Sequence, residues 1–455
     1  MEEPRVCWPY FDPEYENLSQ RINPPSVKID NEISADYTVV KVDSMNKPGI
    51  LLEVVQVLSD LDLTISKAYI SSDGGWFMDV FHVTDQQGNK LLDRKSIDYI
   101  ETALGPRSRK GGISGDNSWT GGKTVGIHSI DDNTAIELIG TDRPGLLSEI
   151  CAVLTDQQCN VLAAEAWTHK TRVASVVYVN DKNSCGPLTD LDRLSAMEEQ
   201  LKNVLGGGGH GGKNASTTFS VGSTHTDRRL HQLMFSDMDS ETNGGEDMDG
   251  KDIFFKPVVT IDYCHEKGYY MVNIRCKDRP KLLYDIVCTL TDMHYIVFHA
   301  SISSVAPDHA LQEYYIRHKD GCTLETEEEK GKVIKCIEAA ILRRVSEGLS
   351  LELCATDRVG FLTDITRILR EHGMSVLRAG VSTVGGQATN VFYVRDSSGN
   401  PVDMKAVEAL KKEIGQSVML NVKKVPNSSV NSSQRMRWAK KTSFTFGSLF
   451  ERFLA

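Results

Sequence analysis

The chain has 455 residues, of which 40% are apolar, and its formal net charge is −11. This size and apolar content allow several hydrophobic cores, and the acidic balance argues against a nucleic-acid partner, because phosphate contacts need a basic surface. No run of 18 apolar residues occurs and no apolar segment of the signal-peptide type follows Met1, so we expect neither a transmembrane segment nor secretion.

The cysteine and histidine content is typical of an intracellular protein that holds no metal. The ten cysteines form no C-x-x-C pair, and Cys151 and Cys288 lie among apolar helix residues, where a small buried thiol packs well. The twelve histidines form no H-E-x-x-H pair, so neither a metal nor a cofactor is expected. We expect a cytoplasmic protein and leave entry into the nucleus open.

The same pattern of residues occurs four times along the chain. An apolar strand is followed by Asp or Asn, a basic residue, usually Pro-Gly, and then a leucine-rich helix. The four turns begin at Asn46, Asp142, Asp278 and Asp357. Because internal repeats decide the architecture of a chain, we predict four copies of one structural unit.

Each copy continues in the same way after its first helix. A β-branched strand, a short turn and a second strand come next, and a second helix then begins near Arg94, Leu191, Glu327 and Asp403. Runs rich in Val, Ile, Tyr and Phe that are bounded by Gly, Asp and Asn are typical of strand hairpins. With a fourth strand each copy reads βαββαβ, which predicts an α+β, ferredoxin-like fold with an antiparallel sheet and both helices on one face.

Glycine-rich and acidic segments separate the four copies. Such compositions bury too little apolar surface to form a packed core. The predicted divisions are module one at 36–104, a linker at 105–123, module two at 124–222, a helix and acidic Gly-rich linker at 223–255, module three at 256–347, module four at 348–424 and a basic, aromatic tail at 425–455.

The third copy lacks room for its last strand. Only three residues separate its second helix, which ends near Val345, from the first strand of the fourth copy. An apolar, β-branched segment precedes the copy instead, at Val259–Tyr263. We therefore predict that this segment replaces the missing strand and pairs with the first strand of the third copy.

The turn of the second copy has the chemistry of a small zwitterion site. Asp142 is predicted to cap the helix, with Pro144 near its first position and Gly145 allowing close approach to the backbone. The N–H groups of Leu146 and Leu147 are then expected to lack intrahelical partners, and such a helix start binds a carboxylate well. An acidic side chain beside it suits an ammonium group. The same turn is also a good helix start on structural grounds alone, so both interpretations stay open.

The turn DRPGLL at 142–147, set in a βαββαβ unit, resembles the ACT domain, a regulatory module that binds small molecules. Four copies in a chain of this length resemble the plant ACR family of ACT-domain-repeat proteins, over nearly all of residues 36–421. The resemblance implies free amino acids as ligands, no attached catalytic domain and therefore no enzyme activity. It also implies an effector site where two modules meet at this turn.

The four copies differ in how well they keep the turn. The second is intact, the fourth has Val359 in place of Pro, and the third has Lys281 in place of Gly, whose side chain would crowd a ligand. The candidate ligand-binding residues are Asp142, Gly145, Leu146 and Leu147 in the second copy, Asn46, Gly49, Ile50 and Leu51 in the first, and Asp357, Gly360, Phe361 and Leu362 in the fourth. Each copy also has an acid five positions beyond the Pro or Val, at Glu53, Glu149, Asp285 and Asp364, which suits the helix dipole.

Two other functions stay open at this stage. The chain could be a protein-interaction scaffold, or a homo-oligomer, whose sheet edges pair while the turns have lost their ligand. A nucleotidyltransferase needs a Gly-Ser turn and an Asp pair for metal, and Gly222-Ser223 with Asp237 and Asp239 has this order, although no apolar strand follows. The tail from Arg435 interleaves basic and aromatic residues, so it is either a docking segment for a partner or membrane surface, or a solvated disordered tail.

Overall fold

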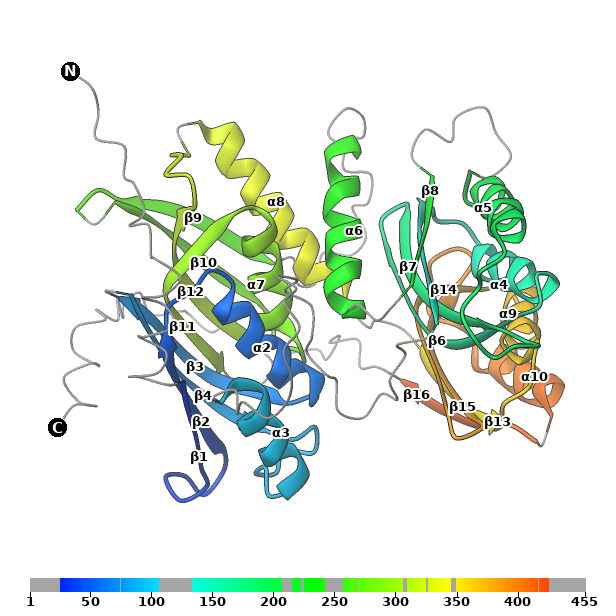
Figure 1. The fold of residues 1–455 in the computed structure, drawn as a ribbon, viewed down its shortest axis with the longest axis horizontal. Helices are drawn as coiled ribbons and strands as arrows, with labels where there is room; N and C mark the ends of the chain where they lie inside the picture. The colour runs from blue at the N-terminus through cyan, green and yellow to red at the C-terminus, as the bar shows by residue number, and fades with distance from the viewer. Residues whose placement is uncertain are drawn as a thin grey trace. The chain divides into compact units, whose positions relative to one another are not determined.

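The computed structural model describes residues 25–73, 75–105, 133–206, 215–221, 225–241, 257–266, 268–305, 309–324, 326–344, 349–415 and 417–424. These residues form two antiparallel eight-stranded sheets with helices packed against them (Figure 1). The predicted α+β, ferredoxin-like fold is confirmed. The predicted tail at 425–455 and nearly all of the linker at 105–123 lie outside the described residues. Within the described part of the chain, no helix is long and apolar enough to cross a membrane.

The first sheet combines the first and third repeats. Its strands are β1 (Ser26–Asp30), β2 (Thr38–Met45), β3 (Thr64–Asp73), β4 (Trp76–Thr84), β9 (Val258–Cys264), β10 (Tyr269–Lys277), β11 (Tyr295–Val305) and β12 (His309–His318), in the order β1-β2-β4-β3-β11-β12-β10-β9. The helices are α2 (Ile50–Asp60), α3 (Arg94–Leu104), α7 (Leu282–Asp292) and α8 (Glu327–Arg343). Apolar residues of these helices and strands form one continuous core.

The second sheet combines the second and fourth repeats. Its strands are β5 (Thr134–Thr141), β6 (Cys159–His169), β7 (Arg172–Asp181), β8 (Ser216–Val221), β13 (Leu349–Thr356), β14 (Met374–Val384), β15 (Gln387–Asp396) and β16 (Met419–Lys424), in the order β16-β13-β15-β14-β6-β7-β5-β8. Its helices are α4 (Leu146–Asp156), α5 (Leu191–Gly206), α9 (Phe361–Glu371) and α10 (Met404–Ile414). The first helices of the two repeats touch, because the hydroxyls of Thr155 and Thr363 lie 2.7 Å apart.

The repeats thus pair with partners that are not their neighbours in the sequence. In the first sheet β3 pairs with β11, with Ile70 opposite Ala300, and in the second β6 pairs with β14, with Ala166 opposite Ala379. In all four repeats the second strand also shifts its register by one residue against the third, as it does between Val376 and Arg378 of β14. Such a bulge bends the strand and leaves one residue outside the ladder.

The first and third repeats carry their fourth strand before their first strand. Strand β9 pairs antiparallel with β10, with Ile261 opposite Val272, so the predicted replacement strand of the third repeat is confirmed. Strand β1 pairs with β2 in the same way. The predicted start of module one at residue 36 omitted this strand. Only Val27 and Ile29 of its five residues pack on the core, and an alternation of two apolar residues is too short to predict a strand.

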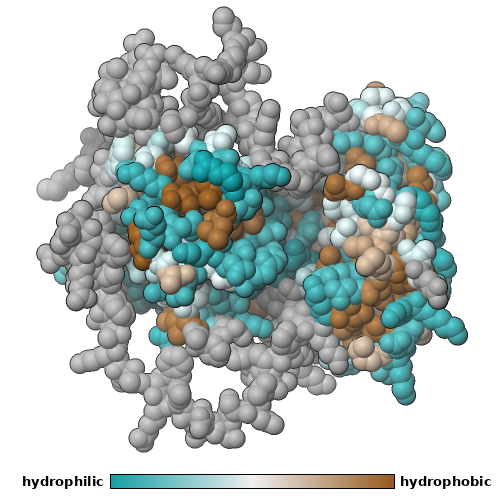
Figure 2. Space-filling model, turned by 90° about the horizontal axis from the view of Figure 1, so that it is seen from below, coloured by the Kyte–Doolittle hydropathy of each residue, from teal (hydrophilic) through white to brown (hydrophobic). Residues whose placement is uncertain are grey.

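Each sheet leaves two strands at its edges. Within the described residues β1 and β9 have one neighbouring strand in the first sheet, as do β8 and β16 in the second. Some apolar side chains on these edges are exposed, including Val258 at 54% and Met419 at 76%. Figure 2 shows one face of the molecule, on which apolar residues gather in patches among hydrophilic ones. An open strand edge is able to pair with a strand of another chain, which is the surface that the scaffold alternative requires.

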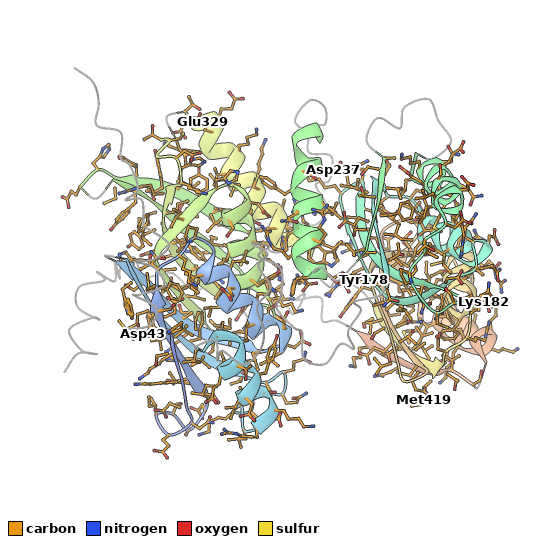
Figure 3. All side chains as sticks on the ribbon, in the orientation of Figure 1. Asp43, Tyr178, Lys182, Asp237, Glu329 and Met419 are labelled. Carbon is orange, nitrogen blue, oxygen red and sulfur yellow. The ribbon has the colours of Figure 1, made fainter. Side chains whose placement is uncertain are left out.

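A further helix, α6 (Thr226–Glu241), covers the other face of the second sheet. Leu230 and Met234 of α6 pack with Trp167 and Tyr178 of the sheet in a small core. Figure 3 labels Tyr178 of the sheet and Asp237 of α6. The helix lies in the segment predicted to contain one, but its packing on the sheet was not predicted. Both faces of the second sheet are therefore covered near β6 and β7.

Candidate functional site

Each turn enters its helix through one residue with a left-handed backbone. The φ values are 86° at Gly49, 85° at Gly145, 62° at Lys281 and 82° at Gly360, and these residues, without a side-chain cap, precede the helices. Left-handed φ is costly for residues with a Cβ but not for glycine. The backbone of the turn therefore favours glycine, and Lys281 adopts the same conformation in the third repeat at the cost of local strain.

The prediction that Asp142 caps the helix was wrong. The left-handed residue comes directly before α4, so Gly145 occupies the cap position. Asp142 lies three residues earlier, where its backbone N–H donates to the Thr171 carbonyl at 2.7 Å. The turn closes on itself, because the N–H of Leu146 donates to the carbonyl of Arg143 at 3.1 Å.

The start of α4 nevertheless presents unpaired N–H groups. The N–H of Leu146 is used by the turn, contrary to prediction, and the first helical bond runs from Glu149 to the Gly145 carbonyl. In the described part of the chain no group accepts a hydrogen bond from the backbone N–H of Leu147 or Ser148. The available donors are therefore those of Leu147 and Ser148, one residue further along than predicted. Together with the helix dipole they can bind an anion.

These groups line a cavity of about 260 Å³ between the second and fourth repeats. The four candidate residues of the second repeat, Asp142, Gly145, Leu146 and Leu147, are all among its lining residues. The opposite wall comes from the fourth repeat: Leu369 and Arg370 of α9, the start of β14 from Met374 to Arg378, and Arg395 and Asp396 at the end of β15. A hydrogen bond joins the bulge of β14 to the second repeat, because the Thr168 hydroxyl donates to the Leu377 carbonyl at 2.8 Å.

Sequence reasoning did not identify the wall from the fourth repeat. Its residues carry no motif, and only the pairing of β6 with β14 brings them to the turn. The cavity does lie where two modules meet, which is the placement that the resemblance implies. The ligand role of the four turn residues stays a prediction.

The charge of Asp142 is adjusted by its surroundings. The carboxylate is partly buried, and burial raises its pKa to about 6, although the Arg143 backbone N–H and guanidinium oppose this effect. At pH 7 the group is therefore mostly ionised. A carboxylate that has left bulk water in this way has a strong preference for a cationic partner such as an ammonium group.

The acid five positions beyond the proline has a structural role in three repeats. Arg143 donates two hydrogen bonds to Glu149, one of them 2.8 Å long. Arg358 pairs with Asp364, and Arg279 pairs with Asp285 at 2.7 Å. The basic residue of the turn and the acid of the first helical turn thus form a clamp. This contact fixes the turn and adds to the favourable dipole interaction that was predicted.

The third turn offers less space than that of the second repeat. A cavity at the third turn measures about 20 Å³, which is room for about one water molecule. Lys281 lines this cavity and is held there by Asp227 at 3.0 Å. Neither cavity is lined by the candidate residues of the first and fourth turns, namely Asn46, Gly49, Ile50, Leu51, Asp357, Gly360, Phe361 and Leu362.

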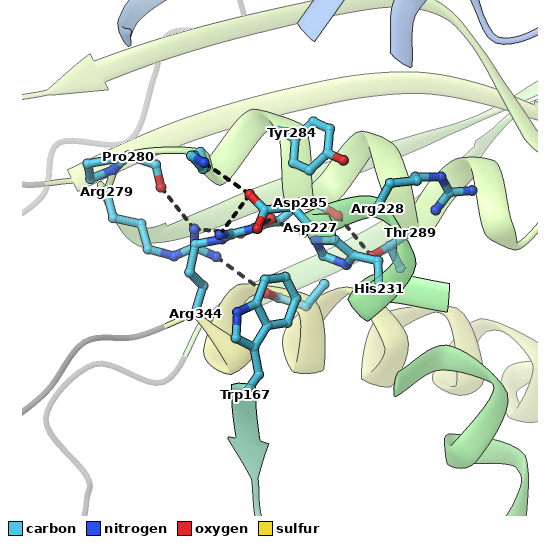
Figure 4. Close-up of polar contacts among 12 residues, drawn as sticks. Trp167, Asp227, Arg228, His231, Arg279, Pro280, Tyr284, Asp285, Thr289 and Arg344 are labelled. Atoms are coloured by element: carbon cyan, nitrogen blue, oxygen red, sulfur yellow. Dashed lines mark hydrogen bonds and ion pairs between the residues drawn. The ribbon is translucent and has the colours of Figure 1, made fainter. Parts of the chain in front are cut away.

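The third turn is instead connected to α6 by buried charges (Figure 4). Asp285 is fully buried and accepts hydrogen bonds from Arg344 at 2.9 Å and from His231 of α6 at 2.7 Å. Burial opposes the charge of Asp285, but Arg344, Arg279 and His231 hold its pKa well below the usual range. The Arg344 guanidinium also lies 4.4 Å from the ring centre of Trp167. The segment around His231 was predicted only as a helix, and no motif indicated this network.

Comparison with known proteins finds matches along the chain. The model of the ACR family N-terminal ACT domain matches residues 33–111, the ACT domain model matches 134–206 and 349–414, and the model of the ACR9-like, ACT-like domain matches 258–349. Each matched segment contains one of the four turns.

Three similar proteins come from Arabidopsis thaliana and match over almost their full length. The ACT domain-containing protein ACR3 is 63% identical over 99% of this chain and 99% of its own. ACT domain-containing protein ACR5 is 53% identical over 91% of each chain. ACT domain-containing protein ACR4 is 51% identical over 97% of this chain and 96% of its own.

Proposed function

This chain belongs to the ACR family of ACT-domain proteins, and on that basis we propose that it is a non-catalytic sensor that binds a free amino acid. The proposed site is the cavity between the second and fourth repeats. The first, third and fourth turns are proposed to be structural.

One observation carries this proposal: the cavity presents an acidic side chain and unpaired N–H groups side by side. Asp142 and the N–H groups of Leu147 and Ser148 belong to one short turn and helix start. An α-amino acid carries its ammonium and carboxylate on neighbouring atoms, so it can satisfy both. The volume of about 260 Å³ lies near the lower end of the range of about 300–1,000 Å³ for small-molecule sites, which suits a ligand of this size.

The alternative of nucleotidyl transfer receives no support from the acid that it needs. Asp237 lies on α6 and accepts two hydrogen bonds from Arg172, at 2.5 and 2.7 Å. A carboxylate paired with a guanidinium is a poor ligand for a catalytic metal. Gly222 and Ser223 lie outside the described residues. We therefore propose regulation without catalysis.

We propose a cytoplasmic location, which the cysteines support. Cys151 and Cys288 are buried thiols without a disulfide, as predicted, and burial raises the pKa of Cys151 to about 12. Unbridged cysteines are typical of a reducing compartment. We place the protein in the cytoplasm.

Thermal unfolding of the full chain with each of the common free amino acids tests the proposal. A ligand that binds only the folded state raises the melting temperature, by an amount that grows with its concentration. We expect such a rise for one amino acid or one chemical group of them. If every amino acid leaves the melting temperature unchanged and calorimetry detects no binding, the sensor proposal is wrong. The open sheet edges would then favour the scaffold function.

A further inference from the structure

Among the described residues that line the cavity between the second and fourth repeats, Arg370 has a guanidinium that is bonded to neither the turn nor the sheet. Two of the arginines that line it are held by carboxylates: Arg143 by Glu149, and Arg378 by Glu165 at 2.8 Å. The guanidinium of Arg370, on the last turn of α9, makes no hydrogen bond or ion pair with any described residue. Its charge acts on the start of α4, where it lowers the pKa of Glu149 as a smaller effect beside that of Arg143.

Arg370 is held over the turn by its apolar stem. A Cβ added to Gly145 would lie 2.7 Å from Cδ and 3.1 Å from Cγ of Arg370. The stem therefore packs against the glycine, and Arg370 is an exposed residue that lines the cavity. This contact is specific to one side of the repeat pair, because Thr155 occupies the equivalent place at the fourth turn, 3.8 Å from a Cβ added to Gly360.

The cavity thus offers three polar recognition points to a ligand. Asp142 suits an ammonium group, the N–H groups of Leu147 and Ser148 suit one carboxylate, and Arg370 suits a second anionic group. A neutral amino acid would satisfy only the first two. A guanidinium that bonds a carboxylate forms a stronger hydrogen bond than one that meets a neutral amide.

We infer that the ligand is an amino acid with an acidic side chain, whose side-chain carboxylate is bound by Arg370 of the fourth repeat. This inference rests on the proposed function, in which the same cavity binds a free amino acid. Arg370 is then the residue that selects the ligand, and the fourth turn lacks this recognition point because Thr155 stands at the equivalent position.

Calorimetric titration of the full chain with two isosteric pairs tests the inference: glutamate against glutamine, and aspartate against asparagine. In each pair only the side-chain charge changes. We expect at least one acid to bind about tenfold more tightly than its amide, which is the size of one hydrogen bond to a charged group.

Two variants locate the preference. Arg370→Met keeps the apolar stem over Gly145 and removes the charge, so we expect the acid and its amide to bind equally. Arg367→Met is the matched control, because Arg367 lies on the same helix, is exposed and pairs with Glu371 at 3.2 Å outside the cavity. We expect this variant to keep the preference for the acid.

The possible failures can be told apart. If an amide or an apolar amino acid binds as tightly as the acids, the inferred ligand class is wrong but the sensor function stands. If the acids are preferred equally by the native chain and by Arg370→Met, the role of Arg370 is wrong. If no amino acid binds at all, both the inference and the proposed function fail.

Discussion

Gly145 and Lys281 occupy the same place in two turns and show what one side chain changes. Both have a left-handed backbone, so the fold of the turn tolerates either residue. At Gly145 the missing side chain leaves space that Arg370 and the cavity share, whereas Lys281 extends to Asp227. The difference between a turn with a cavity and a filled one therefore lies largely in this residue. It could be predicted from the sequence, because a Cβ and a long side chain need space.

Asp142 shows what could not be predicted from the sequence. An acid before Pro-Gly and a helix has the pattern of an N-cap, yet the cap position belongs to Gly145. The deciding factor is the left-handed turn, which closes by the Leu146 to Arg143 bond. The residue type does not specify the backbone conformation at a glycine. The first free N–H group was therefore predicted one residue too early.

The raised pKa of Asp142 predicts how binding depends on pH. With a pKa of about 6, the carboxylate is ionised above this value and becomes neutral below it. A ligand ammonium needs the ionised form, so the association constant should fall about tenfold from pH 7 to pH 5, in line with the ionised fraction. Calorimetry at both pH values measures this fall. Asp142→Asn should bind weakly and lose the dependence on pH between these values, and a native chain that binds equally at both would contradict the role given to Asp142.

At the scale of elements, the clamp between the basic residue of the turn and the acid of the helix is buried to different extents in different repeats. The Asp364 side chain of the fourth repeat is 40% exposed, and the Asp285 side chain at the equivalent place is fully buried between α6, α7 and the end of α8. Removing one partner of a buried ion pair strongly lowers the stability of the folded protein, because the remaining buried charges have no counter-charge. The same contact should therefore contribute very differently to the two repeats.

Asp285→Asn should lower the free energy of unfolding by about 3–5 kcal/mol, since Arg344 and Arg279 lose their buried counter-charge. Asp364→Asn is the matched variant and should cost about 1 kcal/mol or less, as exposed ion pairs do. Urea unfolding of both variants measures the difference. Equal losses in the two variants would show that the network around Asp285 does not hold α6 and the third repeat together.

Most helices and strands could be predicted from the sequence, but the elements that pack against one another could not. The repeating apolar patterns indicate βαββα in every copy, and the lack of space after Val345 indicates the replacement strand β9. The packing of α6 on β6 and β7 had no such signal. The contacts of Leu230 and Met234 with Trp167 join segments about 60 residues apart, and a single sequence does not show which distant apolar surfaces meet.

At the scale of the whole molecule, the pairing of alternate repeats decides where a ligand site is able to form. The second repeat supplies the turn, and the fourth supplies Arg370 and the bulged strand β14. Four similar turns predict four similar sites, but the walls opposite them differ. The first and third repeats pair in the same way, and the cavity at the third turn is an order of magnitude smaller, at about 20 Å³. One chain is therefore expected to bind one ligand.

Calorimetric titration tests this site most directly. The native full chain, Gly145→Lys and Gly49→Lys are each titrated with the amino acid that raises the melting temperature. Both glycines have a φ near 85°, but a Cβ at Gly49 meets no atom within 4 Å, while one at Gly145 meets Arg370 at 2.7 Å. We expect one ligand per chain in the native protein and in Gly49→Lys, and none in Gly145→Lys. Unchanged binding in Gly145→Lys, or loss of binding in Gly49→Lys alone, would contradict a site between the second and fourth repeats.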